Sequence, residues 1–196
     1  MTQSTDRPIR TTDAKPAIDL DGIEALAALI IAAERPCVLF GSELQSPQAI
    51  ELGLTFCREL DLPAYRGGVA PDTFPTNDTY SFEHSRPQAL AQTDLVILLG
   101  VPADQFPASE LGVAGSVPVV RIDFDGRAES KPQGGDLTIA GDCGAVIQAV
   151  LDTIGHAEST GAIQRETWIE HLRTLEKPAA AASALQDIRI ERREAP

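Results

Sequence analysis

Three runs of mainly apolar residues, each closed by a glycine or an acid, constrain this chain more than any other feature. They are Cys37–Phe40 before Gly41, Leu95–Leu99 before Gly100, and Val117–Ile122 before Asp123. Continuous apolar runs of this length are typical of strands that are covered on both faces, as in a parallel sheet. Segments with helical spacing alternate with the runs. The sequence therefore predicts an α/β fold with a doubly wound, mainly parallel sheet and helices on both faces.

The helical segments are recognised by apolar residues that recur every three or four positions. They are Asp21–Glu34 with Asp19 or Asp21 as N-cap, a helix from Pro47 through Leu60, a short helix over Pro87–Ala91, and Asp142–Ile154 with Asp142 as N-cap. Weaker strands are predicted at Pro63–Tyr65 and around Ile139. The stretch Arg66–Ser85 is longer than an ordinary connection, so we expect it to be functional or packed against something else.

The chain divides into three parts. Residues 1–18 are polar and rich in breakers, which predicts a disordered leader. Residues 19–155 carry the alternating pattern and form the α/β domain. Residues 156–196 are expected to be a helical linker and tail, with a helix over Arg165–Glu176 that either folds back on the sheet or leads to another domain.

Charge excludes several classes of partner. The chain has 196 residues, and 16 Lys and Arg against 29 Asp and Glu give a net charge of −13. Such a chain would repel nucleic acid and an anionic membrane surface. It has no long apolar segment, and its cysteines, Cys37, Cys57 and Cys143, show no disulfide or zinc spacing. We therefore expect a cytoplasmic protein with buried, reduced thiols.

No catalytic constellation stands out. The residues after the first strand do not form the glycine-rich NAD fingerprint, there is no Walker loop, and His84, His156 and His171 lack metal-ligand spacing. An independent enzyme would depend on the acid-rich loops and His84. Glycine and acid at strand ends instead suggest a nucleotide, because backbone can approach a phosphate at glycine and a carboxylate can bind ribose hydroxyls.

The order of the segments resembles the central domain of thiamine diphosphate dependent enzymes, in the acetolactate synthase-like and 2-hydroxyacyl-CoA lyase-like branch. The resemblance covers about residues 20–155. It is carried by Arg35–Gly41, Leu62–Ala64, Arg66–Ala70, Pro87–Leu90, Thr93–Gly100, Val119–Asp125 and Ile139–Asp142. It implies a six-stranded parallel sheet of the Rossmann-like, DHS-like NAD/FAD-binding type.

In complete enzymes of that family the central domain lies between a pyrimidine-binding and a diphosphate-binding domain, which hold thiamine diphosphate, Mg²⁺ and the catalytic glutamate. This sequence has no Gly-Asp-Gly metal motif. The resemblance therefore implies a stand-alone or split central domain that is not catalytic alone. A partner chain is expected to carry the other two domains, and self-association into a homo-oligomer stays open.

Several members bind FAD or ADP in this domain. Carried over by position, the contacts fall on Gly41, Ser42, Gly100, Asp104, Asp123, Phe124, Asp142 and Cys143. Glu43 stands where flavin-binding members usually have glycine, and Pro102 and Phe106 stand where they usually offer arginines, which makes the site less favourable for a diphosphate. The alternative function is a free FAD-, ADP- or CoA-binding module or an accessory subunit of a larger complex. Electron-transfer flavoprotein domains and the epsilon subunit of carbon monoxide dehydrogenase complexes are comparable.

Overall fold

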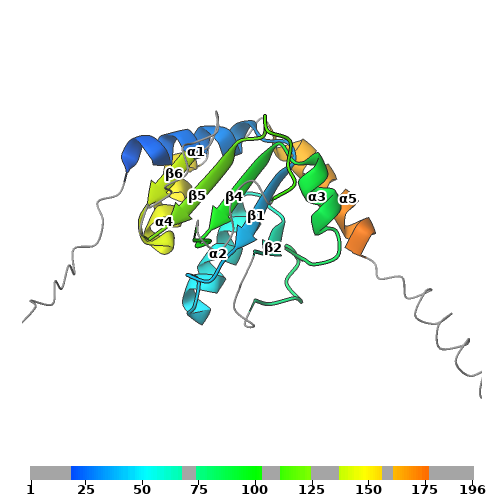
Figure 1. Cartoon of the computed structure of the whole chain (residues 1–196), viewed down its shortest axis with the longest axis horizontal. Coiled ribbons are helices and arrows are strands. Elements are labelled where there is room, and N and C mark those ends of the chain that lie inside the picture. The colour runs from blue at the N-terminus through cyan, green and yellow to red at the C-terminus, as the bar shows by residue number, and fades with distance from the viewer. Residues whose placement is uncertain (1–18, 68–73, 103–110, 125–136, 156–160, 177–196) are drawn as a thin grey trace, which may run out of the picture.

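A six-stranded, all-parallel sheet is the centre of the computed structural model, which describes residues 19–67, 74–102, 111–124, 137–155 and 161–176 (Figure 1). The strand order β3-β2-β1-β4-β5-β6 confirms the predicted doubly wound α/β fold. The elements are α1 (Leu20–Ala32), β1 (Pro36–Phe40), α2 (Pro47–Glu59), β2 (Ala64–Arg66), β3 (Ser81–Phe82), α3 (Arg86–Gln92), β4 (Leu95–Leu99), β5 (Val119–Asp123), β6 (Leu137–Ala140), α4 (Cys143–Ile154) and α5 (Ala162–Glu176).

Three of the helices begin at the capping residues that their sequences provide. Asp19 accepts a hydrogen bond from the Gly22 N–H at 3.1 Å and caps α1, and Asp142 accepts one from the Ala145 N–H at 3.0 Å and caps α4. Ser46 caps α2 in the same way through Ala49, at 3.0 Å. A carboxylate or hydroxyl at this position satisfies an N–H that has no partner within the helix.

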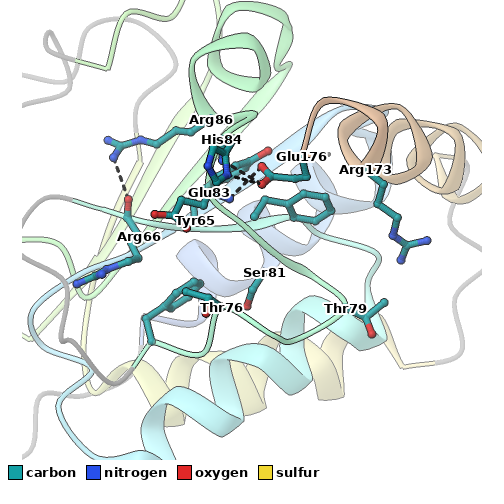
Figure 2. Close-up of a pocket in the computed structure, with 12 residues that line it drawn as sticks. Tyr65, Arg66, Thr76, Thr79, Ser81, Glu83, His84, Arg86, Arg173 and Glu176 are labelled. Carbon is teal, nitrogen blue, oxygen red and sulfur yellow. Dashed lines mark hydrogen bonds and ion pairs between the residues drawn. The ribbon is translucent and has the colours of Figure 1, made fainter. Parts of the chain in front are cut away.

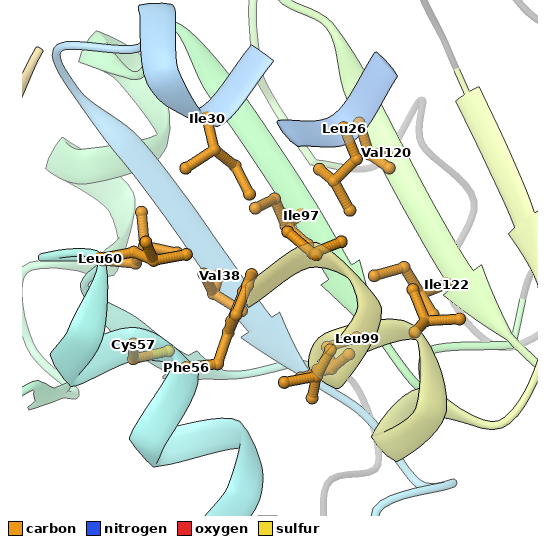
Figure 3. Close-up of a cluster of buried hydrophobic side chains, with 14 of the residues drawn as sticks. Leu26, Ile30, Val38, Phe56, Cys57, Leu60, Ile97, Leu99, Val120 and Ile122 are labelled. Carbon is orange, nitrogen blue, oxygen red and sulfur yellow. The ribbon is translucent and has the colours of Figure 1, made fainter. Parts of the chain in front are cut away.

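The larger core lies between the sheet and helices α1, α2 and α4. Figure 3 shows its centre, where Leu26 and Ile30 from α1 meet Val38, Ile97 and Val120 from three neighbouring strands. These side chains are buried, and the alternate residues of each strand point to the other face. Burial on both faces explains why the strands are continuous apolar runs.

The opposite face of the sheet carries a smaller core with α3 and α5. Ala89 and Leu90 of α3 and Trp168, Ile169 and Leu172 of α5 pack there against Leu39, Val96 and Leu98. The indole Nε1–H of Trp168 donates to the Pro36 carbonyl at 3.1 Å. Thus α5, the described part of the segment beyond Gly155, packs on the sheet.

Arg165 fastens the start of α5 to the end of α1. Arg165 is 2 % exposed, and its guanidinium donates to the Ile30 carbonyl at 3.0 Å and the Ala33 carbonyl at 3.1 Å. The Gly161 N–H donates to the Ile31 carbonyl at 3.3 Å. The last carbonyls of a helix need partners from outside it, and here α5 provides them.

Two details differ from the sequence prediction. Ser81 and Phe82 form the edge strand β3, which the pattern did not reveal because a strand of two residues has no periodicity to detect. The predicted central strand, β4, shares the centre of the sheet with β1. The predicted leader (1–18) and the residues after Glu176 lie outside the described residues.

Candidate functional site

The strand order reverses between β1 and β4, and open parallel sheets commonly bind ligands at this switch point, beyond the carboxyl ends of the strands. Two of the predicted residues, Gly41 and Gly100, meet there. A Cβ added to Gly41 would lie 2.2 Å from the Gly100 carbonyl oxygen, and Gly100 has φ of +65°. Both positions therefore need glycine for the close approach of the two backbones, whether or not a ligand binds.

Glu43 extends across this point. Its backbone N–H donates to the Gly100 carbonyl at 3.0 Å, and its carboxylate Oε2 accepts from the Phe124 N–H at 3.0 Å. The side chain therefore links the end of β1 to the end of β5. A backbone N–H beyond a strand end is a donor that phosphates use, and here it is bonded to a carboxylate of the same chain.

The other predicted residues at these strand ends have structural contacts. Asp123 is 3 % exposed at the end of β5, and Asp142 caps α4. The Cys143 thiol lies 3.8 Å from the Ile122 carbonyl, and burial, with the negative charges of Glu43, Asp142 and Asp123, raises its pKa to about 12. The negative charges of all three carboxylates raise the pKa of the same thiol, so Glu43, Asp142 and Asp123 lie around Cys143. Such a thiol stays protonated and unreactive at neutral pH.

The predicted binding residues that remain are Ser42, Phe124 and Asp104. Ser42 follows Gly41 and is partly exposed, and the Phe124 ring is 55 % exposed. Asp104 and Phe106 lie outside the described residues. The structure thus places seven of the predicted residues at one end of the sheet, as expected of parallel strands: Gly41, Ser42, Gly100, Asp123, Phe124, Asp142 and Cys143.

A groove of about 710 Å³ lies elsewhere, at the β2–β3 side of the sheet (Figure 2). Strand β2, the segment around β3, the start of α3 and the end of α5 form its walls. It is lined by Tyr65, Arg66, Phe74, Thr76, Thr79, Ser81, Phe82, Glu83, His84, Arg86, Arg173 and Glu176. Most of these residues belong to the long segment that the sequence marked as functional or packed against something else.

Glu176, the last residue of α5, occupies the centre of a cluster of donors in this groove. Its Oε1 accepts from the Glu83 N–H at 2.9 Å, the Ser85 N–H at 2.7 Å and the Ser85 hydroxyl at 2.6 Å. Its Oε2 accepts from the His84 N–H at 3.0 Å and lies 3.3 Å from His84 Nδ1. We call Glu83, His84 and Ser85 the carboxylate clamp.

The clamp sets the charge of Glu176. Burial alone would raise the pKa of this carboxyl, but the hydrogen bonds from Ser85, His84 and Glu83 outweigh burial and hold the pKa below its ordinary value. Glu176 is therefore ionised at neutral pH. Sequence reasoning singled out His84 but missed Glu176, because a glutamate at the end of a helix reads as a surface residue.

Metal-ligating side chains and membrane-spanning helices are the last two features considered among the described residues. Within the described ranges no group of three His, Cys, Asp or Glu side chains could hold a metal ion. Among the same residues, no helix is long and apolar enough to cross a membrane.

The fold places the chain in the class of Rossmann-like α/β domains, and in this chain Glu43 bridges the switch point. The model of the thiamine pyrophosphate enzyme central domain matches residues 23–150. The chain belongs to this family of central domains, as its order of motifs predicted.

Individual relatives agree with this assignment. The chain is 27 % identical over 182 residues to a probable acetolactate synthase of Mycobacterium bovis and, equally, to the acetolactate synthase large subunit IlvG of Mycobacterium tuberculosis. These matches cover 91 % of this chain and 32 % of each relative. A sulfoacetaldehyde acetyltransferase of Rhodobacter capsulatus is 26 % identical over 154 residues, which are 72 % of this chain and 26 % of that protein. The chain thus spans about a third or less of these relatives.

Solved structures share the fold. A benzoylformate decarboxylase from Polynucleobacter necessarius superposes with a TM-score of 0.59 at 19 % identity, over 78 % of this chain and 30 % of that one. A putative thiamin diphosphate-dependent enzyme from Mycobacterium smegmatis gives 0.58 at 20 % identity, over 74 % and 30 %. At this identity the likeness concerns the architecture alone.

Proposed function

We propose that this chain is the scaffold domain of a thiamine diphosphate dependent enzyme of the acetolactate synthase-like, decarboxylase or carboligase type, and that it is not catalytic alone. The observation that carries the proposal is the match of residues 23–150 to the central domain of that family. Pyrimidine- and diphosphate-binding domains would hold the thiamine diphosphate and Mg²⁺. A partner chain, or another part of a longer protein, would supply them.

The arrangement of the switch point supports a structural role. A carboxylate placed among Gly41, Gly100 and Phe124 disfavours the diphosphate of a nucleotide by charge repulsion, and it uses the Phe124 N–H as its own donor. The glycines there have a packing role that needs no ligand. The domain can therefore complete its fold without a nucleotide and present its surface to neighbouring domains.

Isolation of the tagged chain from its source cells tests the proposal. We expect it to co-purify with a protein that contains both missing domains, and the complex to hold thiamine diphosphate and Mg²⁺ and to form acetolactate or a related product. The purified chain alone should show neither cofactor nor product, and an unrelated tagged acidic domain serves as the control. A complex without thiamine diphosphate, or full activity of the isolated chain, would refute the proposal.

The second candidate is a free module that binds FAD, ADP or CoA at Gly41, Ser42, Gly100, Asp104, Asp123, Phe124, Asp142 and Cys143. It is favoured by the strand order, which places a switch point between β1 and β4. A ligand that binds only the folded chain must raise the midpoint of thermal unfolding. No rise with any of the three ligands supports the scaffold proposal, whereas a saturable rise that grows in Glu43→Gln supports the second candidate.

A further inference from the structure

The end of α5 is held by a different kind of contact from the rest of the helix. Trp168, Ile169 and Leu172 are buried against the sheet, whereas Arg173 and Thr174 are exposed. Leu175 packs only partly against this core. In the last turn, the strong attachment is therefore the Glu176 carboxylate in its clamp.

The clamp connects this turn to the interior of the sheet. Ser85 is fully buried, and its hydroxyl, which bonds Glu176, lies 2.9 Å from the Tyr65 hydroxyl. Tyr65 belongs to β2, where it pairs with Leu39 of β1, and its ring lies 5.8 Å from that of Phe82. A continuous set of contacts thus runs from the end of α5 through the start of α3 to the second strand of the sheet.

The same turn forms a wall of the groove. Figure 2 shows Glu176 pointing into the clamp while Arg173, on the same helix, points away from it. The titratable groups that line the groove with Glu176 come from four parts of the fold: Tyr65 and Arg66 on β2, Glu83 and His84 before α3, Arg86 on α3, and Arg173 on α5. If Glu176 left the clamp, the groove would lose its α5 wall and the clamp would lose its acceptor.

We propose that Glu176 is a latch. While its carboxylate occupies the clamp, the last turn of α5 closes one side of the groove. When the carboxylate leaves, this turn separates from the sheet, the groove opens, and the rest of the domain stays folded. The latch goes beyond the proposed scaffold function and depends only on contacts within this domain, so it can fail or hold independently of whether a thiamine-enzyme partner exists.

Hydrogen–deuterium exchange on the full chain tests the latch. Glu176→Gln keeps the shape of the side chain but removes the charge, and it turns an NH₂ group toward the clamp donors. We expect the amides of residues 83–85 and of the last turn of α5 to exchange at least about tenfold faster, because the three backbone N–H groups lose their charged acceptor and hydrogen bonds to a charged group are stronger than neutral ones. The amides of β1 and α4 should not change.

Two further variants make the result specific. Glu170→Gln makes the same chemical change at an exposed position of α5 and should leave every segment unchanged. Ser85→Ala removes one donor but keeps the carboxylate and the three backbone N–H groups, so we expect a smaller increase in the same segments. Three results would overturn the latch. The first is unchanged exchange at residues 83–85 in Glu176→Gln, and the second is an equal increase in β1 and α4 of that variant. The third is the same local increase in Glu170→Gln.

Discussion

Replacing Arg165 by methionine tests whether α5 is an integral part of the domain. The guanidinium donates to the carbonyls of Ile30 and Ala33 at the end of α1, at 3.0 and 3.1 Å. The Glu34 N–H, which would otherwise continue the helix to Ile30, donates instead to the Asp94 carboxylate at 2.8 Å. The variant therefore leaves both carbonyls without this partner in a buried place.

The expected loss follows from opposing contributions. Two hydrogen bonds from a charged donor contribute about 3 kcal/mol together. Methionine fills a similar volume and no longer requires burial of a charge, which offsets about 1 kcal/mol. We therefore expect Arg165→Met to lower the free energy of unfolding by about 2 kcal/mol, which corresponds to roughly 4–8 °C in a domain of this size. Arg173→Met, at an exposed position of the same helix, should change it by less than about 0.5 kcal/mol.

Urea unfolding followed by two signals measures this change. Trp168 is the only tryptophan and is buried on α5, so its fluorescence reports this helix, while far-ultraviolet circular dichroism reports the whole fold. If α5 belongs to the cooperative unit, both transitions coincide and shift together in Arg165→Met. The reasoning is refuted if Arg165→Met unfolds like the parent chain, or if fluorescence changes at lower urea than circular dichroism in the parent chain.

Three other outcomes follow from the structure. Gly41→Ala should destabilise the fold by about 3 kcal/mol or more in the same urea assay, because its Cβ would lie 2.2 Å from the Gly100 carbonyl, whereas Gly115→Ala, with nothing within 4 Å, should be nearly neutral. Cys143, with a pKa of about 12, should resist iodoacetamide at pH 7.5 until the chain is unfolded, as mass spectrometry can verify; rapid labelling of the folded chain would contradict its burial. The clamp lowers the pKa of Glu176, so the stabilisation that the ionised carboxylate gives the fold is complete above the unfolded pKa of about 4.3 and is lost as the pH falls through the lower folded pKa. Glu176→Gln should therefore lose less stability in acid than the parent chain. The same dependence of stability on pH in both proteins would contradict this expectation.

The fold could be predicted because its signals are local. Each main strand is a continuous apolar run, each of the longer helices has its periodic apolar face, and Asp142 sits where a capping residue is needed. Strand β3 was not predicted, because Ser81 and Phe82 form a strand only by pairing with Ala64 and Tyr65 in the assembled sheet.

The candidate site was only partly predictable. Parallel strands place their carboxyl ends together, so the residues after β1, β4 and β5 could be grouped from sequence alone. The clamp could not be predicted from sequence, because Glu176 is 91 to 93 residues away from its donors and a glutamate at a helix end usually faces solvent. Arg165 was missed for the same reason: its two acceptors are 132 and 135 residues away.

Glu43, which sequence reasoning placed at the switch point, and Glu176, which it missed, have the same chemical role. Glu43 accepts from the Phe124 N–H at the switch point, and Glu176 accepts from three consecutive N–H groups beside the groove. In both places backbone donors that could receive an external anion are bonded to a carboxylate of the chain itself. For a chain of net charge −13, an external anion would have to displace that carboxylate and approach against the overall charge. This makes a scaffold role in a larger enzyme a better explanation of the domain than an independent nucleotide-binding role.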